Sequence, residues 1–147
     1  MIRIGNPEDT AIIADFNQKM AWETEKKQLD PTIINPGVEA VLKDSSKGFY
    51  LLFMEDNEVV GQLMVTYEWS DWRNNTIWWI QSVYVREDQR GKGIYTALYE
   101  EVKRRAKEAG IQTIRLYVEK ENARAQRVYR HHGMEATHYD LFEVTLA

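Results

Sequence analysis

One stretch of the sequence has the residue types of an anion-binding turn. It reads REDQRGKGIY over residues 86–95, after the apolar run SVYV and before a segment with helical periodicity. Where a strand passes through such a turn into a helix, the first helical N–H groups lack helical partners and the helix dipole adds positive potential. These donors would be the backbone amides of Gly91, Lys92, Gly93 and Ile94. The turn is therefore a candidate site for a phosphate or pyrophosphate group.

The same turn has an equally good structural interpretation. Glycine is common between a strand and a helix because it adopts left-handed backbone angles, and charged side chains in turns are usually solvated. The pattern matches neither GxxxxGK[ST] nor GxGxxG, which disfavours P-loop and Rossmann sites. The glycine spacing alone does not decide between a connector and a binding turn.

The elements that position this turn follow from hydrophobic periodicity. Three runs with period-two alternation predict an antiparallel meander, with a turn at Asp56-Asn57 between the first two. Apolar residues at steps of four then predict a helix over 93–109 that ends at Gly110. The expected strands of the meander and after it are 49–56, 58–69, 75–85, 111–118 and 139–146, with a further helix at 122–132.

The residues before the meander are expected to be mainly helical. A short strand at 2–4 precedes Asn6 and Pro7, which suit the N-cap and first position of a helix. Two shorter helical pieces are expected at 22–29 and 35–44. This order predicts an α/β (α+β) fold, with a mixed sheet flanked by helices and a parallel, right-handed strand–helix–strand unit. Ligands of such sheets usually bind beyond the carboxyl ends of strands, where the turn at 86–95 lies.

Length and composition exclude several classes of protein. The 147 residues suit a single domain, 1–147, and the absence of cysteine excludes disulfides and thiolate chemistry. The net charge of −4 argues against nucleic-acid binding, and the absence of a long apolar run argues against a membrane span. The three histidines lack metal-site spacing, so no metal is expected. The default expectation is a cytoplasmic protein.

Two linked segments, SVYVREDQRGKGIYTALYEEV and IRLYVEKENARAQRVYRHHGM, resemble the GNAT superfamily of acyl-CoA-dependent N-acetyltransferases. The resemblance is specific over residues 78–134 and otherwise rests on element order. The family signature is Arg or Gln, two residues, Gly, one residue, and Gly or Ala. It falls on Arg90, Gly93 and Tyr95, so the last position departs from the pattern. The resemblance implies a GNAT-like, mostly antiparallel twisted sheet.

The resemblance also implies how acetyl-CoA is bound. The loop amides, those of Gly91, Lys92, Gly93 and Ile94 in this sequence, would hold the pyrophosphate, and the signature positions Arg90 and Tyr95 are the other cofactor-binding candidates of the turn. The backbone of Val83, Tyr84 and Val85 would pair with pantetheine like an added strand, with an amide near Val83 donating to the thioester carbonyl. Tyr95 would point away from the phosphates or line the cofactor channel.

Two residues of the helix at 122–132 complete the resemblance. By the resemblance, Asn122 would bond the pantetheine arm or the leaving region, and Tyr129 would protonate the departing thiolate. They are seven residues apart, so they project from similar angles on one helix. Their structural interpretations are an N-cap for Asn122 and a core tyrosine for Tyr129.

An amine acceptor requires a proton acceptor, which this family often draws from its meander. The segment YEWSDWRNNTIWWIQS, residues 67–82, holds four of the five tryptophans together with Glu68 and Asp71. It suits either a pocket for a cationic amine or a buried sheet face with a charged hairpin. Glu68 is the first candidate base and Asp71 the second. The candidate substrate-binding residues are Trp69, Trp72, Trp79 and Gln81.

The predicted function is transfer of an acetyl group from acetyl-CoA to a primary amine of a small molecule, peptide or protein, by direct attack in a ternary complex. The alternative is a catalytically silent acyl-CoA-binding or sensor domain. Dimerisation is common in the family, so the resemblance leaves a homodimer open.

Overall fold

The computed structural model describes residues 1–147, and the chain forms two compact units, Met1–Tyr117 and Val118–Ala147. The first unit contains the whole sheet and most of the helices, and the second contains one helix and the C-terminal segment. The expectation of a single domain over 1–147 stays a prediction. None of the helices is both long and apolar enough to cross a lipid bilayer.

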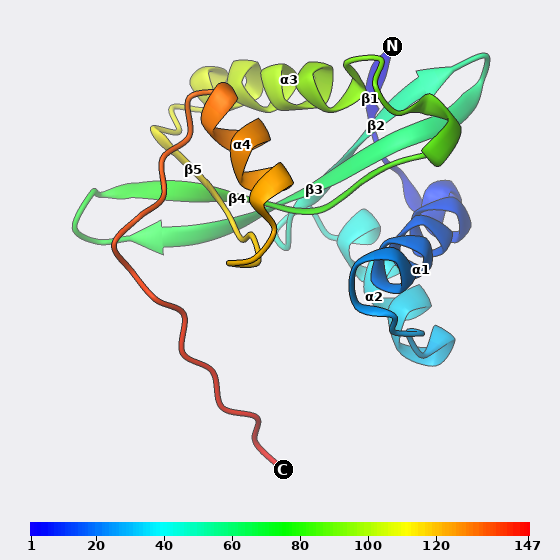
Figure 1. Ribbon diagram of the computed structural model, residues 1–147, viewed down its shortest axis with the longest axis horizontal. Helices are drawn as coiled ribbons and strands as arrows, with labels where there is room; N and C mark the ends of the chain where they lie inside the picture. The colour runs from blue at the N-terminus through cyan, green and yellow to red at the C-terminus, as the bar shows by residue number, and fades with distance from the viewer. The chain divides into compact units, whose positions relative to one another are not determined.

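The first unit is built on a five-stranded sheet in which the strands follow chain order (Figure 1). Every neighbouring pair is antiparallel except β4 and β5, which are parallel and are joined through helix α3. The predicted meander and the predicted parallel strand–helix–strand unit are therefore both confirmed. The strands are β1 Ile2–Ile4, β2 Phe49–Glu55, β3 Glu58–Ser70, β4 Asn75–Val85 and β5 Thr113–Leu116.

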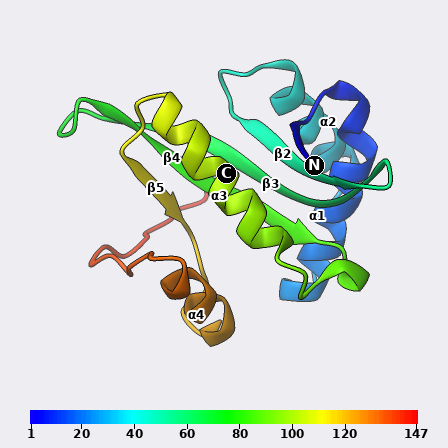
Figure 2. The same ribbon diagram turned by 90° about the horizontal axis from the view of Figure 1, so that it is seen from above.

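Helices cover both faces of this sheet (Figures 1 and 2). Helices α1 (Thr10–Glu25) and α2 (Pro31–Lys43) pack on one face, where Ile13 and Val38 join Tyr50 and Leu52 in a buried cluster. Helix α3 (Ile94–Glu108) crosses the other face close to β3. A Cβ atom at Gly61 would lie 2.8 Å from the Cγ2 atom of Ile94, so glycine permits this close approach.

The turns of the first unit have clear local causes. Asp56 and Asn57 both have positive φ, 50° and 62°, as a tight hairpin with the right-handed strand twist requires. Asn6 caps the 3-10 turn η1 (Pro7–Asp9) that leads into α1, and the Asp9 carboxylate accepts a hydrogen bond from the Asn6 N–H in return.

Two predicted helix boundaries are wrong. Residues 22–25 continue α1 instead of forming a separate helical piece, and α2 begins at Pro31 instead of near Asn35. The Asp30-Pro31 pair supplies the same cap and first-position signal earlier in the chain. The Asp30 carboxylate accepts the Thr32 N–H at 2.9 Å, which fixes the helix start there.

The second unit contains helix α4 (Ala123–His131) and an extended C-terminal segment. The predicted strand over 139–146 is absent. Its alternation describes side chains only, whereas a strand also requires a neighbouring strand that satisfies its backbone groups. Phe142 and Leu146 consequently stay 92% and 86% exposed.

Candidate active site

The glycine turn has the backbone geometry of a helix-start anion site. After the short 3-10 turn η2 (Glu87–Gln89), Gly91 and Gly93 both adopt φ of 78°, which is strained for any residue with a side chain. Gly93 is the N-cap of α3 and, as a glycine, provides no side-chain cap for that helix. No atom lies within 4 Å of a Cβ built at either glycine. The glycines are thus required by backbone angle, and the space beside them is open to a ligand.

The arginines of the turn are held by carboxylates. Arg86 forms ion pairs with Glu58 and Asp88 at 3.0 and 2.7 Å. Arg90 contacts Glu23 of α1 at 2.9 Å, and its Nε donates to the Val85 carbonyl at 2.8 Å. Arg90 therefore ties the turn both to α1 and to the end of β4.

The Tyr95 side chain, at the position where the family pattern has a small residue, packs along its own helix. Its ring stacks on that of Tyr99, one helical turn further, with centroids 6.1 Å apart and planes inclined by 30°. The ring of this non-matching residue is therefore accommodated by α3 itself.

Strand β4 extends beyond its partner β5. Pairing with β5 covers Ile77 to Ile80 only, so residues 81–85 have no strand on that side. In the same stretch the register to β3 shifts: Met64 faces Gln81 and Gln62 faces Tyr84, so Ser82 and Val83 together stand opposite Leu63. Ser82 has φ of 52°. This is a β-bulge, and it lies in the stretch predicted to pair with pantetheine.

The Glu68 carboxylate lies in a small cluster of aromatic and basic side chains. Its Oε1 accepts a hydrogen bond from the Trp79 indole N–H at 2.8 Å and lies 3.7 Å from an Arg115 guanidinium nitrogen. The Trp79 ring stacks on Tyr117 with centroids 4.5 Å apart. The structure thus brings together one predicted base and one predicted substrate-binding tryptophan.

The remaining candidates from the meander do not all join this cluster. Gln81 lies on the same face of β4 as Trp79, where its amide donates to Thr66 at 2.6 Å. Trp69 is cross-strand from Thr76 and lies on the opposite face. Trp72 and Asp71 are in the hairpin turn, where Trp72 is 90% exposed. Trp78 is buried against Phe49 and Tyr67, on the face of β4 opposite to its neighbour Trp79.

The second unit holds the two candidates of α4. The Asn122 Oδ1 accepts the Ala125 N–H at 3.0 Å, so Asn122 is the N-cap of the helix. Burial raises the pKa of the Tyr129 hydroxyl above its ordinary value of 10, so that group is protonated at neutral pH. The roles of both residues toward a cofactor stay predictions.

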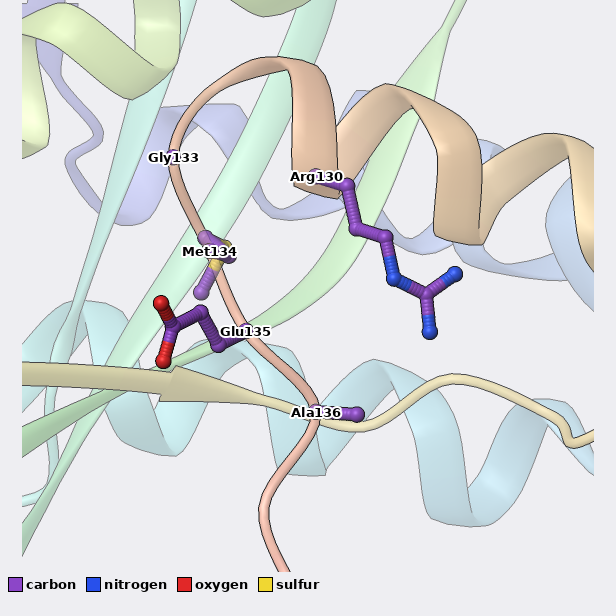
Figure 3. Close-up of a pocket in the computed structure, with 5 residues that line it drawn as sticks. All are labelled: Arg130, Gly133, Met134, Glu135 and Ala136. Carbon is purple, nitrogen blue, oxygen red and sulfur yellow. The ribbon is translucent and has the colours of Figure 1, made fainter.

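A shallow hollow in the second unit contains none of the predicted site residues. In Figure 3 the Arg130 side chain extends to the right and the Glu135 side chain to the left, so the two point away from one another. The hollow is lined by Arg130, Gly133, Met134, Glu135 and Ala136. Its lining offers no converging set of polar groups, so we assign it no ligand. No group of three or more His, Asp or Glu side chains is placed to hold a metal ion.

Sequence reasoning missed three residues that the fold places at or near these candidates. Arg115 contacts Glu68, and Tyr117 stacks on Trp79. The predicted parallel pairing of β4 with β5 could have indicated these contacts, because its register places Arg115 beside Trp79. Gln62 is fully buried beneath the β4 bulge. A lone glutamine within an apolar strand was its only sequence signal.

Comparisons with known proteins agree with this architecture. A possible acetyltransferase from Clostridium difficile 630 is 42% identical, with a TM-score of 0.95 over 100% of this chain and 97% of the other. A predicted acetyltransferase from Clostridium acetobutylicum, solved with acetyl-CoA, shares the fold at 17% identity and a TM-score of 0.82, over 99% of this chain and 95% of that one.

A ribosomal-protein-alanine N-acetyltransferase from Brucella melitensis biovar Abortus 2308 also shares the fold, at 18% identity and a TM-score of 0.80, over 100% of this chain and 99% of the other. No functionally curated protein matches the sequence. The acetyltransferase (GNAT) family model matches residues 10–134. With most of its length matched, this chain belongs to the GNAT family of acetyltransferases.

Proposed function

We propose that this acetyltransferase moves an acetyl group from acetyl-CoA to a primary amine of a small molecule, peptide or protein. The observation that carries the proposal is the open, bulged end of β4, which leads into the glycine turn at the start of α3, where the N-cap residue is Gly93. One continuous stretch of backbone thereby offers N–H donors for the thioester carbonyl, for the pantetheine arm and for the pyrophosphate of acetyl-CoA.

The residues present fit acetyl-CoA. The left-handed glycines keep the turn free of side chains where phosphates would approach, and residues 81–85 lack a β5 partner where pantetheine would pair. Acetyl-CoA supplies the acetyl group already activated as a thioester. The chain must then bind and orient the thioester, accept a proton from the attacking amine, and donate a proton to the departing sulfur.

Each of those tasks has a candidate residue. The Val83 N–H would donate to the thioester carbonyl oxygen as negative charge grows there. Glu68 would accept a proton from the amine, directly or through water, and Tyr129 would donate one to the departing sulfur. Because Glu68 shares a sheet face with Trp79 and Gln81, these two are the substrate-binding candidates that can act with it.

The function is tested by following thiol release from acetyl-CoA with a panel of primary amines, and with alcohols as the comparison. Amine-dependent thiol release together with an acetylated amine by mass spectrometry is the expected result. Release that responds only to alcohols would make the protein an O-acetyltransferase and contradict the proposed acceptor.

A matched pair of glycine variants tests the cofactor site. Gly93 and Gly110 lie at opposite ends of α3, both with left-handed φ and both open to solvent. Gly93→Glu and Gly110→Glu therefore impose similar backbone strain, but only the first places a carboxylate at the proposed pyrophosphate site. We expect CoA affinity to fall by at least tenfold in Gly93→Glu alone, since like charge there is worth more than ~1.4 kcal/mol. Equal affinities would remove the turn from the site.

A silent acyl-CoA sensor is the alternative, and it has one supporting observation. Glu68 is already held by Trp79 and Arg115, as a purely structural carboxylate would be. Tight CoA binding without turnover for any acceptor would favour the sensor. If ATP or NAD raised the thermal unfolding temperature as much as CoA does, the site would instead be a general nucleotide site.

A further inference from the structure

A buried polar network lies directly beneath the β4 bulge. The Gln62 side chain is fully buried, and its Nε2 donates to the Asn17 Oδ1 at 3.0 Å and to the Ser82 carbonyl at 3.1 Å. Asn17, also buried, donates to the Tyr50 hydroxyl at 3.4 Å. Because both partners of Nε2 are acceptors, the orientation of the Gln62 amide is fixed by its surroundings.

This network is not arranged for the greatest stability. The Gln62 Oε1 is buried and has no hydrogen-bond partner, which is unfavourable for any polar atom removed from water. Ser82 is held in the left-handed region, which a residue with a side chain adopts only when its surroundings impose it. Two unfavourable features in contact with one another indicate that the geometry they produce serves something other than folding.

That geometry is the direction of one peptide plane. The Ser82 carbonyl and the Val83 N–H belong to the same planar, trans peptide, so they point in opposite directions. The hydrogen bond from Gln62 fixes the carbonyl and thereby also fixes the N–H of Val83. If the carbonyl were released, the bulge could rotate this plane and redirect the N–H without breaking the ladder on either side.

We propose that Gln62 is a positioning residue that aims the Val83 N–H at the thioester carbonyl by holding the Ser82 carbonyl from the opposite side. This inference rests on the proposed function, because the carbonyl exists only if acetyl-CoA is the ligand. A donor that is fixed before the reaction stabilises developing charge without the penalty of reorienting. Gln62 acts through the backbone of β4 and does not contact the substrate.

Two variants separate this role from general stabilisation. Gln62→Met keeps the side-chain length but cannot donate to the Ser82 carbonyl. Tyr50→Phe removes a hydroxyl that contacts Asn17 and the Ser82 side chain, but it leaves the hydrogen bond from Gln62 to the Ser82 carbonyl in place. The readouts are kcat, KM for acetyl-CoA, the Kd for CoA, and the Val83 amide resonance and hydrogen exchange by NMR.

We expect Gln62→Met to lower kcat by about ten- to a hundredfold, somewhat less than full removal of such a donor. CoA lacks the thioester carbonyl, so its Kd should stay within twofold. The Val83 amide resonance should shift more in Gln62→Met than in Tyr50→Phe, whose kcat should be within threefold of the wild type. An unchanged kcat in Gln62→Met, or equal losses in both variants, would overturn the inference.

The two proposals fail in different ways. If the wild-type protein releases no thiol with any acceptor, the proposed function fails, and the Val83 amide still reports whether Gln62 sets its direction. If the wild-type protein is active and the Val83 amide is identical in Gln62→Met, the positioning inference fails and the function stands.

Discussion

The Trp79 indole N–H donates to the Oε1 of Glu68, and the nearest guanidinium nitrogen of Arg115 approaches the same oxygen. Both contacts therefore end on one carboxylate oxygen. In the proposed reaction, the other oxygen, Oε2, would be the one to accept a proton from the amine. This division lets a single carboxylate be held in place by two neighbours and still act as a base.

Replacing Glu68 with glutamine tests that division. Glu68→Gln keeps an oxygen for the Trp79 indole but removes the basic site, so we expect kcat at neutral pH to fall by about a hundredfold, a usual contribution of a general base. The measurement is thiol release at saturating acetyl-CoA. Asp71→Asn, in the exposed hairpin turn, is the control and should be nearly neutral. Similar losses in both variants would contradict the assignment.

Tyr129→Phe tests the proposed acid. We expect turnover to fall about tenfold with no change in CoA affinity, because a thiolate is already a fair leaving group. Burial raises the pKa of Tyr129, so its donating form persists from neutral pH to beyond about 10. The alkaline decline of kcat in the wild type should therefore begin above pH 10 and be absent in Tyr129→Phe. Identical pH profiles would remove Tyr129 from the mechanism.

Glu101 gives the fold a pH dependence. Arg104 and then Arg105 lower the pKa of this carboxyl from its ordinary 4.5 to about 2. A lowered pKa means that the stabilisation is complete above pH 4.5 and is lost as the pH falls toward 2. Because the pair is close to solvent, we expect Glu101→Gln to lose only about 1 kcal/mol of unfolding free energy at pH 7. The difference, measured by urea denaturation, should shrink at pH 3. Glu108→Gln, which removes a single exposed partner of Arg104, should lose less.

Replacement by alanine is expected to change the stability of the fold in opposite directions at Gly48 and Gly37. Gly48 has φ of 150°, and a Cβ there would lie 2.2 Å from the Val65 carbonyl oxygen, so Gly48→Ala should destabilise the protein by about 3 kcal/mol. Gly37 is inside α2 with nothing within 4 Å, so Gly37→Ala should stabilise it by up to about 1 kcal/mol. Thermal unfolding distinguishes them. A tolerated Gly48→Ala would contradict the described packing of β2 against β3.

Much of the fold could be predicted because its signals are local. The period-two runs became β2, β3 and β4, and the four-residue spacing became α3. The start of α2 was misplaced because two Asx-Pro pairs compete, and local rules do not rank them. The prediction of a strand over 139–146 was wrong for a different reason, because strand pairing depends on a partner that is distant in sequence.

The candidate site likewise has one part that local sequence patterns predict and another part that they do not. The turn at Gly91 and Gly93 was visible as a local pattern, and the structure gives both the left-handed angles that such a turn needs. The partners of Glu68 come from another strand, so only the sheet register reveals them. The bulge at Ser82 could not be predicted, because it depends on how β4 is registered against the neighbouring strand, whose buried Gln62 contacts the Ser82 carbonyl.

The paired arginines of the turn also bear on how quickly an anionic cofactor arrives. Arg86 and Arg90 each face a carboxylate, and the whole chain carries a net charge of −4. Such a surface projects little attraction beyond a Debye length, so diffusional encounter gains none of the acceleration that a basic funnel provides. We expect the association rate constant of CoA, measured by stopped flow, not to fall between low and physiological salt, because there is no long-range attraction for salt to screen. Capture of CoA would then depend on short-range hydrogen bonds from backbone amides, which are insensitive to ionic strength.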